Sequence, residues 1–226
     1  MIDTVLWDVD GTLMDFKRSE HEALKKALVE HGYTPTEDEI LLYSKINDSC
    51  WKRYEKGEMS YDDVFTARFK EFFNEIGFSA DIESVNALYR AGLGEIYFLR
   101  DGALELCQGL KGKVRQYIVT NGFAETQIKK VTDSGLINAV DGMFVSGLIG
   151  CPKPEKLFFD RCFEKIGKVD RDKTIIIGDS LTSDMQGGIN ASIHTCWYNP
   201  DGEKNTGVQT DFEITDLSKV PDIIFK

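Results

Sequence analysis

The stretch Asp8-Val9-Asp10-Gly11-Thr12-Leu13 directly follows an apolar run, Ile2 to Trp7, that predicts a buried strand. Two carboxylates therefore stand two residues apart at a strand end, and the glycine lets the chain turn so that both face one ligand. An ionised aspartate can attack phosphorus without a base, while its neighbour can protonate the departing oxygen and then deprotonate water. The stretch predicts phosphoryl-transfer chemistry, with an acidic turn at a strand end as the alternative.

The composition is that of a globular protein with one large or two modest domains, since the chain has 226 residues and is 42% hydrophobic. Its formal net charge of −11 would repel a nucleic-acid backbone or an anionic bilayer, so we expect neither a nucleic-acid polymer nor a membrane as partner. No stretch approaches the roughly 20 apolar residues of a membrane span, and no signal pattern opens the chain. We expect a cytoplasmic protein.

Cysteine and histidine usage argues against other chemistries. An odd number of cysteines without a CxxC pair favours reduced, mostly buried thiols over a disulfide framework or a zinc site. The five cysteines are Cys50, Cys107, Cys151, Cys162 and Cys196. The three histidines, His21, His31 and His194, are far apart in sequence, and no Ser-His-Asp relay is indicated.

The segment after Leu13 is charged and amphipathic with helical periodicity. It predicts four helices, broken at glycines, over residues 17–31, 36–56, 60–76 and 81–98. From about residue 100, short β-rich runs alternate with helical ones, which is typical of βαβ units. The β-rich runs cover residues 115–120, 143–146, 174–177 and 193–198.

These patterns predict an α/β fold, a Rossmann-like parallel sheet core with an inserted helical bundle. Residues 1–14 and 99–226 would form the core, and residues 15–98 the insert. The first strand, Thr4 to Trp7, has no partner in the insert, so we expect it in the middle of the sheet. Residues 199–209 are predicted to form a surface loop.

Ligands of open parallel sheets bind outside the carboxyl ends of the strands. Thr120-Asn121-Gly122 follows the strand predicted at 115–119. Its hydroxyl, its amide and the backbone N–H groups freed by the turn can hold a phosphate oxygen. A plain turn is the alternative for this segment.

Lys153 stands in Cys151-Pro152-Lys153-Pro154-Glu155, just before a helical pattern over residues 156–166. Pro154 suits the first helical position and biases Lys153 towards an extended backbone outside the helix. A lysine placed there can point at the strand ends and neutralise a phosphate. The alternative is a solvated loop lysine.

The run at 174–177 ends in Gly178-Asp179-Ser180-Leu181-Thr182-Ser183-Asp184 and then becomes helical. Asp179 and Asp184 can supply a hard oxygen site for Mg²⁺ together with Asp8 and a backbone carbonyl. With Asp10, four carboxylates oppose the single charge of Lys153, so a phosphate dianion needs a divalent cation to approach. Asp184 can instead hold Lys153 or a metal-bound water.

The four segments, in this order and spacing, resemble the haloacid dehalogenase superfamily of phosphohydrolases over the whole chain. The helical insert resembles the C1-type cap of some members. The resemblance implies that Asp8 is the nucleophile that forms an aspartyl-phosphate and that Asp10 is the acid/base. It also implies that Thr120 and Lys153 bind the phosphoryl group, and we add Asn121 as a phosphate-binding candidate.

The resemblance further implies a Mg²⁺ site made by Asp8, the backbone carbonyl of Asp10 and Asp179, with Asp184 in support. Dehalogenases of the superfamily lack the second aspartate, and P-type ATPases carry a threonine there. Asp10 therefore favours a phosphatase or a phosphomutase.

A second resemblance covers the C-terminal third, in the stretches 178–184, 187–191 and 196–200. They are similar to the pyrimidine 5′-nucleotidase branch that clears noncanonical nucleotides. This implies a small phosphorylated substrate, a nucleoside 5′-monophosphate with a uracil or thymine base. A sugar-phosphate or phosphoglycolate phosphatase, a phosphomutase, and a binding protein on an inactive core remain alternatives.

The cap of such enzymes is expected to close over the strand ends and to supply specificity. Aromatic residues at helical spacing are also typical of a plain core. The candidate substrate contacts are Asp15, Phe16, Arg18, Trp51, Tyr54 and Arg90.

Overall fold

The computed structural model describes residues 1–226 and divides into two compact units. One, which we call the sheet unit, contains Met1–Asp15 and Leu99–Lys226, and the other, the helical unit, is Phe16–Phe98. The two chain segments that leave and re-enter the sheet unit are bonded to each other. Met14 pairs with Leu99 in an antiparallel bridge, and the Arg100 N–H donates to the Leu13 carbonyl at 3.0 Å.

The sheet unit is built on six parallel strands in the order β3-β2-β1-β4-β5-β6. Their bounds are β1 Thr4–Trp7, β2 Arg115–Thr120, β3 Gly142–Val145, β4 Thr174–Gly178, β5 His194–Tyr198 and β6 Phe212–Ile214. β1 lies between β2 and β4, so its predicted central position is confirmed. β1 and β4 are buried along their whole length, as strands covered on both faces must be.

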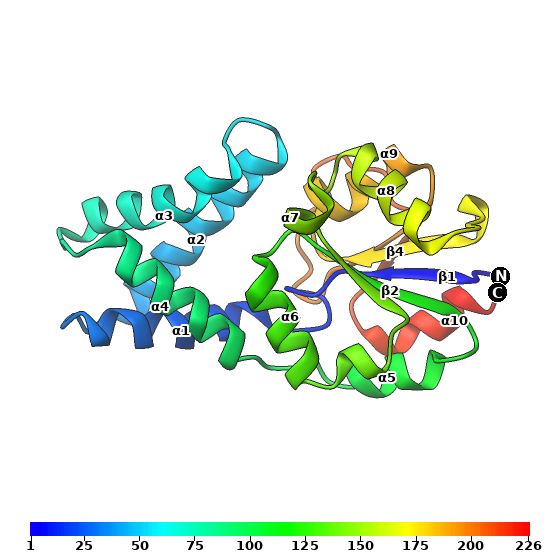
Figure 1. Ribbon diagram of the computed structural model, residues 1–226, viewed down its shortest axis with the longest axis horizontal. Coiled ribbons are helices and arrows are strands. Elements are labelled where there is room, and N and C mark those ends of the chain that lie inside the picture. Colours follow the sequence, from blue (N-terminus) through cyan, green and yellow to red (C-terminus); the bar gives the residue numbers. More distant parts are fainter. The chain divides into compact units, whose positions relative to one another are not determined.

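Helices cover both faces of this sheet. In Figure 1, α8 and α9 lie on one side of β1 and β4, and α5 and α10 lie on the other. The helices of the sheet unit are α5 Ala103–Leu110, α6 Ala124–Asp133, α7 Ser146–Ile149, α8 Lys156–Ile166, α9 Gln186–Ala191 and α10 Val220–Ile224, with single turns η1 Leu136–Asn138, η2 Arg171–Lys173, η3 Leu181–Met185 and η4 Leu217–Lys219. The two chain ends meet, since the Ile2 N–H donates to the Ile224 carbonyl at 2.9 Å (Figure 1).

Two local expectations differ from the structure. α8 begins at Lys156, so Pro154 is not its first residue; the segment before it forms a turn in which Glu155 N–H donates to the Pro152 carbonyl at 2.9 Å. Strand β6 was not predicted, because Phe212–Ile214 is three residues long and its first two residues are exposed. The predicted loop at 199–209 contains no helix or strand.

Strand register brings three chain segments to one level. Trp7 is paired with Ile118 of β2 and with Ile177 of β4. Asp8, the next residue, donates its N–H to the Ile177 carbonyl at 3.0 Å. The residues following each of these three strands therefore meet at the carboxyl edge of the sheet.

The helical unit consists of α1 Phe16–Glu30, α2 Glu37–Glu55, α3 Tyr61–Ile76 and α4 Ile82–Glu95, close to the four predicted helices. Local signals define their ends: a capping box joins Thr36 and Glu39 at α2, Ser60 caps α3, and Asp81 caps α4. The apolar faces meet in a core that contains Leu24, Leu28, Tyr43, Phe69, Phe72 and Tyr89.

The predicted burial of the cysteines is confirmed, since all five are buried; none forms a disulfide in the structure. None of the helices is both long enough and apolar enough to cross a lipid bilayer.

Candidate active site

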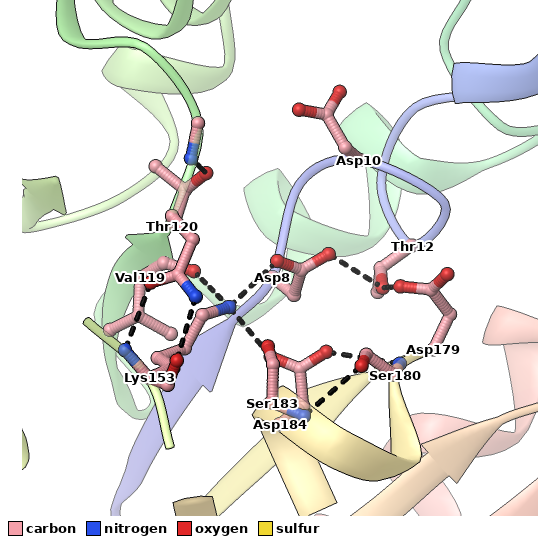
Figure 2. Close-up of polar contacts among 12 residues, drawn as sticks. Asp8, Asp10, Thr12, Val119, Thr120, Lys153, Asp179, Ser180, Ser183 and Asp184 are labelled. Atoms are coloured by element: carbon pink, nitrogen blue, oxygen red, sulfur yellow. Dashed lines mark hydrogen bonds and ion pairs between the residues drawn. The ribbon is translucent and has the colours of Figure 1, made fainter. Parts of the chain in front are cut away.

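Three carboxylates meet at the carboxyl edge of the sheet. Asp8 follows β1, and Asp179 and Asp184 follow β4; one oxygen of each lies within 4.8 Å of the others. Figure 2 shows the three side chains converging from these two segments. The structure thus brings together three of the four acidic residues that the sequence predicted for one site.

Lys153 joins two of these carboxylates. Its Nζ donates to Asp8 Oδ1 at 2.8 Å, to Asp184 Oδ1 at 2.6 Å and to the Val119 carbonyl at 2.9 Å (Figure 2). The three ammonium protons therefore have three acceptors, which is how a lysine with only 1% of its surface exposed can keep its charge.

Asn121 holds the Lys153 backbone in place. The Asn121 side-chain amide donates to the Lys153 carbonyl at 2.8 Å and accepts from the Lys153 N–H at 2.9 Å. Asn121 is itself buried at the end of β2. Its contacts in the structure are those of a residue that positions Lys153, whereas the sequence suggested a direct phosphate contact.

Burial and like charge govern the electrostatics of the cluster. Desolvation raises the pKa of Asp8 to about 7, with Lys153 opposing the shift and Asp184 adding to it. Desolvation, Asp8 and Asp184 together raise the pKa of Asp179 well above its ordinary value. Desolvation opposes the charge of Lys153, but Asp184 and Asp8 outweigh it and raise the pKa of Lys153.

The donor set fits a Mg²⁺ ion. When all three carboxylates are ionised they outnumber the one ammonium, and a divalent cation would balance this charge in a desolvated place. Hard oxygen ligands on a few carboxylates, with water completing the shell, are what Mg²⁺ prefers. Asp8, Asp179 and Asp184 each offer one oxygen as a ligand. Asp184 is engaged with Lys153 through Oδ1 and with the Ser180 N–H at 3.1 Å through Oδ2, and Asp8 is likewise engaged with Lys153 through Oδ1 and with Thr12 through Oδ2.

Two glycines leave the space in which these carboxylates lie. A Cβ on Gly11 would stand 2.2 Å from Asp179 Oδ2, and a Cβ on Gly178 would stand 2.3 Å from the Asp184 carboxyl carbon. Gly11 also has a φ of 96°, in the region that favours glycine. Any side chain at either position would displace an acidic residue of the cluster.

Asp10 lies apart from this cluster. Its carboxylate points away from Asp8 in Figure 2, and it is bound by Gln127 Nε2 at 2.6 Å and by the Lys130 ammonium, both from α6. The side chain of Asp10 does not join the group of Asp8, Asp179 and Asp184. The metal contact through the Asp10 backbone carbonyl, which the resemblance implied, stays a prediction.

Thr120 stands at the end of β2 with its hydroxyl oxygen accepting the Gly122 N–H at 3.1 Å. It follows Val119, whose carbonyl binds Lys153 (Figure 2). Thr120 thus lies beside the lysine with which it was predicted to share a phosphoryl group.

Several residues around the site were not predicted from the sequence. Thr12 Oγ1 lies 3.1 Å from Asp8 Oδ2 and 3.3 Å from Asp179 Oδ1, and Trp197 Nε1 donates to the Asp179 carbonyl at 2.8 Å. Gln127 and Lys130 stand three residues apart after Thr-Asn-Gly, a spacing that places both on one helix face. Two polar residues at that spacing behind a strand-end motif are a signal that could have identified them.

The candidate substrate residues divide between the two units. Asp15 belongs to the sheet unit, where Arg100 Nη1 lies 3.6 Å from its Oδ2. Phe16 packs against the core of the helical unit, and the Arg18 guanidinium lies 3.7 Å from the centre of the Phe98 ring.

An aromatic cluster contains two more of these candidates. The ring of Trp51 lies 5.9 Å from Tyr54, 6.4 Å from Tyr61 and 6.2 Å from Phe65, and the Arg90 guanidinium lies 5.5 Å from the Phe65 ring. These contacts are all within the helical unit, and they are of the kind that a bundle core also makes.

Comparison with known proteins identifies the family. The model of the haloacid dehalogenase-like hydrolases matches residues 2–192, and the chain belongs to this family. It is 38% identical over 222 residues to the HAD-hydrolase YfnB of Bacillus subtilis, covering 98% of this chain and 94% of YfnB. The crystal structure of YfnB bound to magnesium matches with a TM-score of 0.94 over 99% of this chain and 98% of that one.

Two further relatives carry a named activity. The pyrimidine 5′-nucleotidase PynA of Streptococcus pneumoniae is 32% identical over 98% of this chain and 94% of its own. The pyrimidine 5′-nucleotidase YjjG of Escherichia coli is 27% identical over 99% of this chain and 98% of its own. The predictions of a capped haloacid dehalogenase-like fold and of an enzyme of the phosphatase type are confirmed.

Proposed function

We propose that the protein is a Mg²⁺-dependent phosphatase of nucleoside 5′-monophosphates with pyrimidine bases, acting through an aspartyl-phosphate on Asp8. The observation that carries the proposal is the contact of one buried ammonium, Lys153, with both Asp8 and Asp184 beside Asp179. The names of PynA and YjjG support the substrate class, and the magnesium in the YfnB structure supports the metal.

The residues of the sheet unit have separable roles in this proposal. Asp8 attacks phosphorus, and Lys153 with Thr120 neutralises and holds the phosphoryl oxygens. Mg²⁺, held by Asp8, Asp179 and the backbone carbonyl of Asp10 with Asp184 in support, would supply charge neutralisation and orientation of the phosphoryl group. Desolvation by burial raises the pKa of Asp8, and the Lys153 ammonium opposes this shift.

Asp10 is the acid and base of the proposal. In-line phosphoryl transfer puts the attacking and leaving oxygens on opposite sides of phosphorus. A protonated carboxyl group that gives its proton to the leaving oxygen must therefore stand away from Asp8, as the Asp10 side chain does (Figure 2). The same carboxylate then takes a proton from the water that hydrolyses the aspartyl-phosphate.

The test is a phosphate-release screen with purified protein, with Mg²⁺ and with a chelator. The substrates are uridine and thymidine 5′-monophosphates, purine nucleotides, sugar phosphates and phosphoglycolate. We expect release from the pyrimidine nucleotides with the highest kcat/KM, dependent on Mg²⁺ and absent in Asp8→Asn. A higher kcat/KM on a sugar phosphate or on phosphoglycolate would show that the proposed substrate class, pyrimidine nucleotides, is wrong.

Two other outcomes would change the proposal further. Isomerisation of a phosphorylated substrate without phosphate release would indicate a phosphomutase. Appreciable turnover by Asp8→Asn would remove Asp8 as the nucleophile.

A further inference from the structure

Helix α6 presents two polar side chains that are almost fully buried. Gln127 is 2% exposed and Lys130 is 3% exposed, and they stand three residues apart on one face of the helix. Burying an amide and an ammonium is costly unless each has partners. Their shared partner is the carboxylate of Asp10.

The two donors take one oxygen each. Lys130 Nζ forms an ion pair with Asp10 Oδ1, and Gln127 Nε2 donates to Asp10 Oδ2 at 2.6 Å. With an ammonium on one oxygen and an amide on the other, the Asp10 side chain has one preferred orientation. Asp10 itself is 24% exposed in its side chain, so part of the carboxylate remains accessible from outside.

Gly122 leaves the space that the Gln127 side chain occupies. A Cβ on Gly122 would stand 2.1 Å from Gln127 Nε2, the atom that binds Asp10. Gln127 also keeps its Oε1 buried without a hydrogen-bond partner. Unpaired buried acceptors are uncommon in folded proteins, and one is retained here beside the carboxylate.

We propose that Lys130 and Gln127 are positioning residues that fix the orientation of Asp10 for proton transfer to the leaving group. The inference rests on the role of Asp10 in the proposed function. It adds two residues of α6 to the reaction, neither of which touches Asp8, Asp179 or Asp184. Proton transfer needs hydrogen-bond reach, and small misplacements of a catalytic group slow it strongly.

The test uses the basicity of the leaving group. Phenyl phosphate releases a basic phenolate that needs a proton, whereas para-nitrophenyl phosphate releases a weakly basic one that does not. For both substrates, kcat/KM reports the transfer of the phosphoryl group to the enzyme. We expect Lys130→Met to lower kcat/KM on phenyl phosphate by about tenfold more than it lowers kcat/KM on para-nitrophenyl phosphate. Gln127→Met should discriminate between the two substrates in the same direction.

Lys129→Met is the matched control. Lys129 is the neighbouring lysine of α6 and pairs with Asp133 at 2.6 Å on the exposed side of the helix. We expect its kcat/KM to equal that of the unaltered protein on both substrates. Thermal unfolding checks that all variants are folded. If Lys130→Met does not fold, Gln127→Met provides the test.

Asp10→Asn separates the two ideas. If Asp10→Asn lowers kcat/KM equally on both substrates, Asp10 is not the acid, and both its assignment and the inference are wrong. If Asp10→Asn discriminates between the substrates and neither Lys130→Met nor Gln127→Met does, only the inference is wrong. Adding Lys130→Met to Asp10→Asn should change neither value; a further equal loss on both substrates would show a general structural role and overturn the inference.

Discussion

The Lys153 ammonium lies 2.6 Å from Asp184 Oδ1, and each of the two side chains is 1% exposed. A buried ion pair of this kind depends on both members, because removing one leaves the other charged and unsatisfied. Lys153 also binds Asp8, so one side chain connects the stability of the sheet unit with the proposed reaction.

Replacing Lys153 by Met should therefore cost both stability and activity. We expect about 3–5 kcal/mol of unfolding free energy to be lost and phosphate release to fall below detection. Urea unfolding and a phosphate assay measure the two effects. The control is Lys156→Met, since Lys156 is 57% exposed in an i,i+4 pair with Asp160; it should stay within about 0.5 kcal/mol. A stable, active Lys153→Met would contradict the ion-pair account.

Gly11→Ala tests whether space beside Asp179 limits the site. The added Cβ would stand 2.2 Å from Asp179 Oδ2, so we expect weaker Mg²⁺ binding and a large loss of kcat. Gly112→Ala is the control for backbone strain, since Gly112 has a φ of 76° and open space around its Cβ. Calorimetric Mg²⁺ titration and kcat compare the two. Equal effects of both substitutions would show that strain, and not displacement of Asp179, is the cause.

Asp179→Asn should stabilise the metal-free protein and remove most of the stabilisation that Mg²⁺ provides. In the metal-free protein, desolvation and the neighbouring Asp8 and Asp184 disfavour a charged Asp179, so the neutral amide should raise the melting temperature. Binding of Mg²⁺ should stabilise the unaltered protein by about 2.7 kcal/mol at 100 times Kd, and the variant far less. Thermal unfolding with Mg²⁺ and with a chelator measures both. The exposed Asp101→Asn should behave like the unaltered protein, and a full Mg²⁺ response in Asp179→Asn would exclude Asp179 as a ligand.

Glu20 gives the helical unit a pH-dependent stability. It is 2% exposed, and desolvation raises its pKa from 4.5 to about 7, against the hydrogen bonds from Ser44 and Asn47. Between these values the folded state holds a proton that the unfolded state releases, so stability falls as pH rises through this window and is level above it.

Glu20→Gln should remove this slope. At about pH 5 the variant and the unaltered protein should be similar, and at about pH 8 the variant should be more stable by about 1–3 kcal/mol. Urea unfolding across the pH range measures the difference, with the exposed Glu30→Gln on the same helix as control. Parallel pH curves for Glu20→Gln and the unaltered protein would show that Glu20 is ionised throughout.

Local patterns sufficed for most elements of this chain. β1, β2 and α8 have the bounds that their runs predict. The spacing of apolar residues in a strand or an amphipathic helix follows from which of its faces is buried, so the sequence shows it directly. The convergence of Asp8 and Asp179 was also predictable, since each follows a strand and parallel strands bring their carboxyl ends to one edge. The short edge strand β6 was not, because three mostly exposed residues carry too little pattern.

Which side chains contact one another could not be read from these patterns. Asp10 and Lys130 are 120 residues apart, and Lys153 and Asp8 are 145 apart, so their contacts depend on strand register and on the path of α6. The engagement of Asn121 with the Lys153 backbone has the same origin. Residue types specify which chemistry a strand end can perform, whereas packing of distant segments determines which donor faces which carboxylate.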